Sequence, residues 1–267
     1  MVLVLYPRER AHKPLSHRKW NNLALALVCA TCVFILIPKG NFYDVTFHVR
    51  HITSITMTSD LSADDLRLKQ FNSLTFEPEQ LDYNLENPSK FDFSRGQSKI
   101  IDELLGRKEE GFFLDLGAGD GETNSVSLFF ERHRHWNGVL LEGDEDTFRR
   151  LLAKNRRAIC WNFRLRFDSG PDPPQDLEVY PRDVFRLINR TFIDLLVINL
   201  REHELHILQS IDFDRYTIDV ISVELETSRS REEYPQLVSF LAGHGYGVVH
   251  LLIDTAAGKK DVVFRKA

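Results

Sequence analysis

Short apolar runs alternate with amphipathic stretches over the carboxyl-terminal two thirds of the chain. Continuous apolar runs with the length of buried strands lie at 111–116, 138–142, 158–163, 193–198 and 218–225. Helical patterns lie between them, at 125–134, 144–157, 202–211 and 232–241. Buried strands joined by helices are typical of a parallel sheet that is covered on both faces.

Two further apolar runs, 246–253 and 261–265, end the chain with no helical pattern between them. Such a pair predicts an antiparallel hairpin at one edge of the sheet. A proline-rich break at 170–174 separates the two halves of the alternating pattern. The sequence therefore predicts an α/β domain of Rossmann-like architecture with a C-terminal β-hairpin.

A separate apolar segment lies near the amino terminus. Residues 20–38 are uncharged, and as a helix they would span about 28 Å, close to the hydrocarbon thickness of a membrane. We expect one transmembrane signal anchor over 22–38. A cleaved signal peptide is the main alternative, but residues 33–39 contain no small-x-small cleavage site. A buried core helix is the second alternative.

Charge is distributed unevenly along the chain. The chain has 34 Lys and Arg against 39 Asp and Glu, a formal net charge of −5, which excludes a uniformly basic nucleic-acid-binding protein. Basic residues outnumber acidic ones before the apolar segment, so the positive-inside rule places the amino terminus in the cytosol. This predicts a single-pass type II membrane protein of the secretory pathway with a lumenal body. Asn189-Arg-Thr191 is then an N-glycosylation acceptor.

Four segments follow from these patterns. We expect a cytosolic basic tail over 1–21, the anchor over 22–38, a stem over 39–90 and a folded domain over 91–267. The stem is rich in Ser and Thr and has no periodic apolar face. The sequence has no Cys/His cluster with zinc-ligand spacing, no nucleophile elbow and no P-loop. We therefore expect no metal site.

A glycine-rich turn follows the first predicted strand of the domain, at the position where ligands bind in open α/β sheets. Asp115 lies near the end of that strand, and the turn contains Gly117, Gly119, Asp120 and Gly121. The glycines allow a tight turn and close approach of a ligand, and we expect their amides to offer hydrogen-bond donors. Asp115, Asp120 and Glu122 would repel a pyrophosphate but suit a ligand with amine, hydroxyl or sulfonium groups. S-adenosylmethionine has all three.

Glu142 ends the second predicted strand, about twenty residues after the glycine-rich turn. An acidic side chain there can accept hydrogen bonds from both ribose hydroxyls of an adenosine. NAD would use the same carboxylate, but the G-x-G-x-x-G spacing is absent, and an ordinary surface turn is a further alternative. We expect S-adenosylmethionine as cofactor, bound by Asp115, Gly117, Gly119, Asp120, Gly121 and Glu142.

Several motifs carry a resemblance to a known family: SRGQSKIIDELL at 94–105, GFFLDLGAGDGE at 111–122 and WNGVLLE at 136–142. With residues 189–194 and 218–224, they resemble the FkbM-type methyltransferase domain over most of 91–267. The order of basic tail, membrane helix, stem and domain resembles the Star-type single-pass membrane proteins. The resemblance implies an S-adenosylmethionine-dependent methyltransferase fold. It also implies a link to the movement of membrane cargo between endoplasmic reticulum, Golgi and endosomes.

The end of the fourth predicted strand departs from the family pattern Asp-Val-Glu-Gly, because Asn199, Leu200, Arg201 and Glu202 occupy the matching positions. A fold can persist where its chemistry is lost. Two hypotheses therefore stay open. The chain is a membrane-anchored methyltransferase whose acceptor, such as a glycan hydroxyl, lies in the secretory lumen. Alternatively, it is a catalytically inactive Star-type factor that moves membrane-protein cargo.

A third hypothesis is a soluble cytosolic methyltransferase whose apolar segment packs internally. For any hydroxyl acceptor, a general base assists methyl transfer. The positional candidates for this base are His203, Glu204, Glu224, His244 and His250.

Overall fold

The computed structural model of the protein describes residues 75–76, 81–167, 178–226, 230–254, 256 and 258–267, which all belong to one compact unit, 58–267. The expected tail, the expected anchor, most of the expected stem and the proline-rich break lie outside the described residues. Within the described part of the chain, no helix has the length and apolar character needed to cross a membrane.

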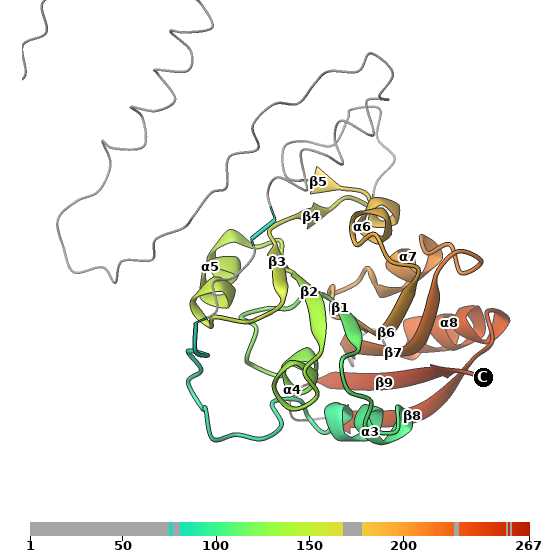
Figure 1. Cartoon of the computed structure of the whole chain (residues 1–267). Helices are drawn as coiled ribbons and strands as arrows, with labels where there is room; N and C mark the ends of the chain where they lie inside the picture. The colour runs from blue at the N-terminus through green and yellow to red at the C-terminus, as the bar shows by residue number, and fades with distance from the viewer. Residues whose placement is uncertain (1–74, 77–80, 168–177, 227–229, 255, 257) are drawn as a thin grey trace, which may run out of the picture. The chain divides into compact units, whose positions relative to one another are not determined.

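A seven-stranded sheet forms the centre of the domain, in the order β3-β2-β1-β6-β7-β9-β8 (Figure 1). Its strands are β1 (Phe112–Leu116), β2 (Asn137–Leu141), β3 (Ile159–Trp161), β6 (Phe192–Ile198), β7 (Thr217–Glu226), β8 (Tyr246–Asp254) and β9 (Lys259–Lys266). The first five in this order are parallel, whereas β9 is antiparallel to both β7 and β8. The predicted Rossmann-like architecture with a C-terminal hairpin is confirmed.

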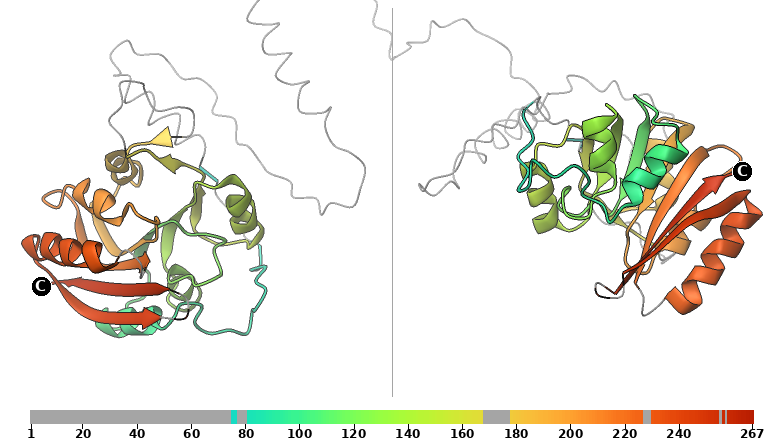
Figure 2. Two further views of the ribbon diagram at one scale, coloured as in Figure 1. Left: turned by 180° about the vertical axis from the view of Figure 1, so that it is seen from behind. Right: turned by 90° about the horizontal axis from the view of Figure 1, so that it is seen from below.

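Helices cover both faces of the sheet, as Figure 2 shows. On one face, α3 (Gln97–Leu104), α4 (Ser127–His133) and α5 (Glu145–Ala153) contribute to a core cluster around Phe113 and Leu140. On the other, α6 (Pro181–Leu187), α7 (Glu204–Gln209) and α8 (Ser230–Gly243) pack around Leu116 and Val223. The five parallel strands thus bury side chains on both sides, which is why they appear as continuous apolar runs in the sequence.

Some elements differ from the sequence-based prediction. Helix α5 ends at Ala153 instead of continuing to Arg157, because the chain turns at Asn155, whose φ is +52°. The turn places the Arg156 side chain inside the core, where it is 1% exposed. Helices α3 and α6 and the two-stranded sheet of β4 (Arg164–Leu165) and β5 (Glu178–Val179) were not predicted. Strands β4 and β5 have two residues each, which is too few to show a period.

The packed part of the chain begins upstream of Phe91, the expected start of the domain. We call residues 81–93 the strap. Its side chains Leu85 and Phe93 are buried against Leu128 of α4. Two isolated apolar residues in a polar stretch produce no periodic pattern, so composition placed most of this segment in the stem.

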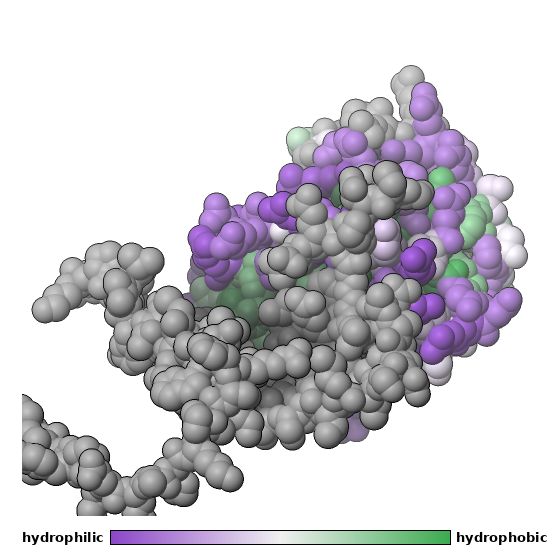
Figure 3. Space-filling view, turned by 90° about the horizontal axis from the view of Figure 1, so that it is seen from above, coloured by the Kyte–Doolittle hydropathy of each residue, from purple (hydrophilic) through white to green (hydrophobic). Residues whose placement is uncertain are grey.

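Hydrophilic residues predominate on the described surface that Figure 3 shows, with smaller hydrophobic patches between them. Strand β8 lies at the end of the strand order. It carries four exposed apolar side chains, Val248, Val249, Leu251 and Ile253. This edge of the sheet therefore presents an exposed apolar surface.

Candidate functional site

The carboxyl ends of β2, β1 and β6 are aligned with one another and with Val223 of β7, so that the residues that follow them form one row across the sheet. Leu116 of β1 lies opposite Leu141 of β2 and Ile198 of β6, and Ile198 lies opposite Val223 of β7. The next residue on each strand is Gly117, Glu142, Asn199 and Glu224, respectively. Because the strand order reverses between β1 and β6, this row lies where open α/β sheets bind their ligands.

Gly117 makes the tight turn that the sequence predicted. Its φ is +86°, and a Cβ on it would lie 2.0 Å from the backbone oxygen of Asn199. The Gly117 amide donates a hydrogen bond to the Leu141 carbonyl at 2.9 Å. The turn therefore fits between the ends of β2 and β6 only when this residue has no side chain.

Gly119 and Glu142 are in direct contact. The Gly119 amide donates a hydrogen bond to Glu142 Oε2 at 3.0 Å, and the Asp144 amide donates to Oε1 at 2.8 Å. A carboxylate has about four acceptor positions, so each oxygen of Glu142 can accept a further hydrogen bond. Apart from Gly119 and its two chain neighbours, no described residue has a non-hydrogen atom within 4 Å of the position that a Cβ on Gly119 would take. The structure thus brings an accessible carboxylate and an open stretch of backbone together.

Asp120 and Gly121 shape the loop. Asp120 Oδ1 accepts hydrogen bonds from the amides of Glu122 and Thr123, and Oδ2 accepts one from Thr123 Oγ1. Burial opposes the charge of Asp120, but these hydrogen bonds outweigh it and lower the pKa of the carboxyl group. Gly121 has a φ of +76°, and a Cβ on it would lie 2.3 Å from Leu151 Cδ1.

Asp115 lies inside the domain, below the glycine loop. Its side chain is 3% exposed, and its Oδ2 accepts a hydrogen bond from Ser127 Oγ at 2.6 Å. Burial raises the pKa of Asp115 to about 6. Asp115 therefore supports the loop from below, and a ligand on the surface of the loop would not reach it without a rearrangement.

The loop amides are not the free donors that the sequence analysis expected. The amides of Gly117 and Ala118 both donate to the Leu141 carbonyl, the Gly119 amide donates to Glu142, and the Gly121 amide donates to the Ala118 carbonyl. Backbone groups in a buried turn need partners, and the neighbouring strand supplies them. The expectation of free donors is therefore wrong for these four amides.

Glu122 also differs from its expected role. Its carboxylate is buried and accepts hydrogen bonds at 2.9 Å from the amides of Glu86 and Asn87 in the strap. Lys154 Nζ lies 2.8 Å from Glu122 Oε2. Burial raises the cost of this charge, but Lys154 and the strap amides outweigh it and lower the pKa of Glu122. Glu122 is thus a structural anion, and Glu142 is the carboxylate of this region that is placed for a ligand.

Arg156 is the residue that sequence analysis missed. Its Nε lies 3.1 Å from Glu131 Oε1, and its terminal nitrogens donate to the Gly121 carbonyl and, at 3.2 Å, to Ser127 Oγ. The guanidinium therefore connects the glycine loop with α4 and, through Ser127, with Asp115. In the sequence, Arg156 lies in a polar stretch at the end of a helical pattern, and no local signal distinguishes it from a surface residue.

Of the five candidates for a general base, Glu224 is the one in the row. Val223 and Leu225 pack in the core on the α6–α8 side, so the Glu224 side chain points to the face covered by α3. There it pairs with Arg95, and its Oε1 lies 2.9 Å from Lys259 Nζ. Burial opposes this charge, but Arg95 and Lys259 together lower the pKa of Glu224.

The other four candidates have different surroundings. The Glu204 carboxylate accepts hydrogen bonds from the backbone amides of Leu200 and Glu202, which lie in the turn between β6 and α7. His244 lies at the end of α8, on the opposite edge of the sheet from the row, and the ring of His203 stacks on Phe167 at 4.1 Å. His250 lies in the middle of β8, the edge strand.

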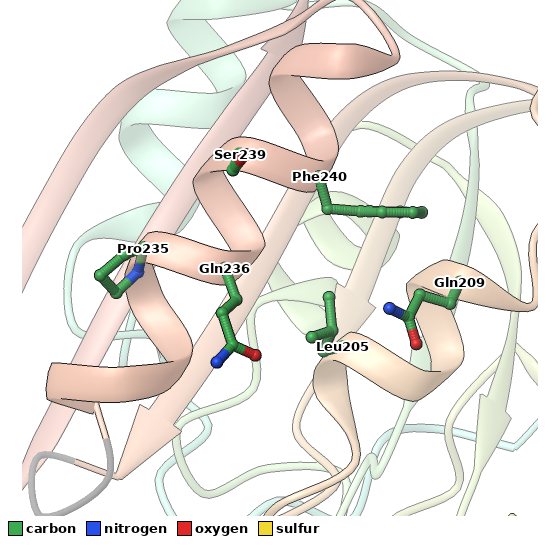
Figure 4. Close-up of a pocket in the computed structure, with 6 residues that line it drawn as sticks. All are labelled: Leu205, Gln209, Pro235, Gln236, Ser239 and Phe240. Carbon is green, nitrogen blue, oxygen red and sulfur yellow. The ribbon is translucent and has the colours of Figure 1, made fainter.

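Within the described residues, no group of three or more His, Cys, Asp or Glu side chains is arranged to hold a metal ion. A shallow pocket lies between α7 and α8 (Figure 4). Its lining residues are Leu205, Gln209, Pro235, Gln236, Ser239 and Phe240. It includes neither the glycine loop nor Glu142, so it is separate from the candidate site.

Comparison with known proteins gave structural similarities only. No protein-family model matches the chain, and no curated protein sequence matches it. A methyltransferase from Pyrococcus furiosus is 14% identical with a TM-score of 0.44, covering 70% of this chain and 91% of that chain. A precorrin-6y C5,15-methyltransferase from Geobacter metallireducens is 16% identical with a TM-score of 0.41, covering 66% and 91%. A TehB-like SAM-dependent methyltransferase from Corynebacterium glutamicum is 14% identical with a TM-score of 0.41, covering 64% and 88%.

Proposed function

We propose that the domain binds S-adenosylmethionine and is a methyltransferase-like domain of the FkbM type. The observation that carries this proposal is the contact between Gly119 and Glu142 at the reversal of strand order. Glu142 retains acceptor positions for two ribose hydroxyls, and the open backbone at Gly119 allows a ligand to approach closely. The residues present therefore fit an adenosyl ligand.

When bound, S-adenosylmethionine supplies a methyl group that is attached to a positively charged sulfur, which leaves readily as a neutral thioether. The protein's task is then to align the acceptor and to exclude water. The row of polar residues continues from Gly117 to Asn199 and Glu224, so an acceptor is expected beyond the ends of β6 and β7. Because its pKa is lowered, Glu224 is better suited to orient a hydroxyl as a hydrogen-bond acceptor than to take its proton.

We further propose that the domain is anchored in a membrane of the secretory pathway and faces the lumen, as a type II protein. The support is the sequence of residues 1–38, a basic tail followed by an uncharged apolar segment. Asn189 is exposed at the end of α6 with a φ of +49°, so a glycan there meets no packed core. An endoglycosidase shift that is lost in Asn189→Gln supports the lumenal orientation, and no shift in secretory cells contradicts it.

The alternative function is that of a catalytically inactive Star-type factor for membrane cargo. Its support is the turn after β6, where Asn199, Leu200, Arg201 and Glu202 stand in place of the family's Asp-Val-Glu-Gly, so that an amide and a cation replace two carboxylates. The nearby Glu204 carboxylate accepts hydrogen bonds from the amides of that same turn. If this alternative holds, Gly119→Val leaves cargo transport unchanged, whereas deletion of 22–38 abolishes it. Equal loss of transport in both variants would exclude pure scaffolding.

Calorimetric titration of the full-length protein in detergent with S-adenosylmethionine tests the proposed function. Wild type is expected to bind, and Glu142→Ala to bind at least about tenfold more weakly, because a hydrogen bond to a charged group contributes about 1.5–3 kcal/mol. Glu145→Ala is the matched control, since Glu145 is an exposed residue at the start of α5. Absence of binding to wild type, or equal binding to all three proteins, would contradict the proposal.

A further inference from the structure

The strap contacts the glycine loop directly through Glu122. The amides of Glu86 and Asn87 donate to the two oxygens of the Glu122 carboxylate, each at 2.9 Å. Lys154 Nζ lies 2.8 Å from both Glu86 Oε1 and Glu122 Oε2, so one ammonium group bridges strap and loop. Glu122 is 3% exposed, and a carboxylate at that depth requires these partners. The strap therefore supplies part of what holds the end of the loop.

A second connection runs through the interior. The Arg157 guanidinium lies over the ring of Tyr83 in the strap, 4.9 Å from its centre, and the Arg157 amide donates a hydrogen bond to Glu131 Oε1 at 2.8 Å. Glu131 pairs with Arg156, and Arg156 donates to the Gly121 carbonyl. Gly121 precedes Glu122, so both connections from the strap end within two consecutive loop residues.

The strap is itself fixed by contacts at several points. The Asn84 amide donates to the Lys154 carbonyl at 3.0 Å, and its side chain donates to the Ala153 carbonyl at 2.9 Å. Arg132 of α4 donates to the Pro88 carbonyl at 2.9 Å. Leu85 supplies the apolar contact, buried against α4. These contacts lie at α4 and at the end of α5, so the strap connects the two elements that flank the loop.

We propose that the strap is a positioning element of the adenosyl site: its docking fixes the loop from Gly119 to Glu122, and its release lowers the affinity for the ligand. This inference rests on the proposed function. The physical reason is that release removes two amide donors from a buried carboxylate, which must then move toward water and take the loop with it.

Leu85→Ala in the full-length protein is the test variant, because it loosens the strap without changing a residue of the loop. Leu81→Ala is the matched control, since Leu81 belongs to the same segment and is 50% exposed. Hydrogen–deuterium exchange without ligand is the first readout. Leu85→Ala is expected to raise exchange at 83–88 and at 118–125 together, while exchange in β6 and β7 stays unchanged. Leu81→Ala is expected to behave like wild type.

Titration with S-adenosylhomocysteine is the second readout, with at least fivefold weaker binding expected for Leu85→Ala. Glu122→Gln, which removes the charge from the loop side, is expected to give the same two effects and covers the case that Leu85→Ala does not fold. Raised exchange in the strap with unchanged exchange at 118–125 would overturn the inference. Since exchange needs no ligand, this outcome is distinguishable from failure of the proposed function, in which wild type itself does not bind.

Discussion

Replacing Gly117 or Gly119 by alanine separates the structural role of the loop from its role in binding. Both residues have positive φ, +86° and +60°, so alanine at either position carries the cost of a left-handed backbone, about 1–2 kcal/mol. The two positions differ in the space available for a side chain. A Cβ at Gly117 would lie 2.0 Å from the Asn199 backbone oxygen, whereas a Cβ at Gly119 would have no described residue within 4 Å other than Gly119 and its two chain neighbours.

The contact at Gly117 involves backbone on both sides, so strand ends must move apart to relieve it. Overpacking of this kind costs about 1–3 kcal/mol in addition to the backbone term. We therefore expect Gly117→Ala to lower the free energy of unfolding by about 2–5 kcal/mol and Gly119→Ala by about 1–2 kcal/mol. Gly119→Ala is nevertheless expected to weaken binding of S-adenosylmethionine, because its methyl group occupies the space through which the ligand approaches.

Denaturant unfolding followed by tryptophan fluorescence measures the first effect, since Trp136 and Trp161 are both buried. Calorimetric titration measures the second. Equal destabilisation by both substitutions, or a greater loss for Gly119→Ala, would refute the geometric argument. Unimpaired ligand binding by a folded Gly119→Ala protein would refute the assignment of this residue to the site.

Three further predictions concern the domain around the loop. Arg156→Met is expected to cost about 3–5 kcal/mol, because it leaves the buried Glu131 carboxylate without its positively charged partner, whereas the double variant with Glu131→Met recovers most of this loss in denaturant unfolding. Burial raises the pKa of Asp115 from 3.8 to about 6, so its contribution to stability is full below pH 3.8 and is lost as pH rises through about 6. Relative to wild type, Asp115→Asn should therefore be more stable at pH 7.5 than at pH 4 by on the order of 3 kcal/mol, and a pH-independent difference would contradict the assignment. Ile253→Lys, at a position that is 52% exposed on β8, is expected to change the free energy of unfolding by less than about 0.5 kcal/mol, and a larger loss would show that this strand edge is covered.

Much of the sheet was predictable because its strands are buried on both faces. Residues 111–116 and 193–198 show this directly, since a continuous apolar run allows few other structures. The contact of Gly119 with Glu142 was also predictable in outline. Both residues follow strand ends, and the ends of parallel strands meet at one edge of a sheet.

The partners that hold the loop were not predictable from the same pattern. Arg156, Glu131 and Lys154 lie in polar stretches that look like solvent-exposed helix ends. Their burial depends on a turn at Asn155 and on a strap whose apolar contacts are single residues. Long-range ion pairs of this kind leave no periodic signal in a sequence. For the same reason, Glu122 was interpreted as a ligand-facing acid when its partners lie in the strap.

The most direct test of the central claim is the amide resonance of Gly119 during titration of the labelled protein with S-adenosylhomocysteine. The account predicts saturable shifts of the Gly119 and Asp144 amides, the two that donate to Glu142, while the Gly247 amide on the edge strand β8 stays in place. Saturable binding that leaves the Gly119 and Asp144 resonances unmoved, or no binding at all, would contradict it.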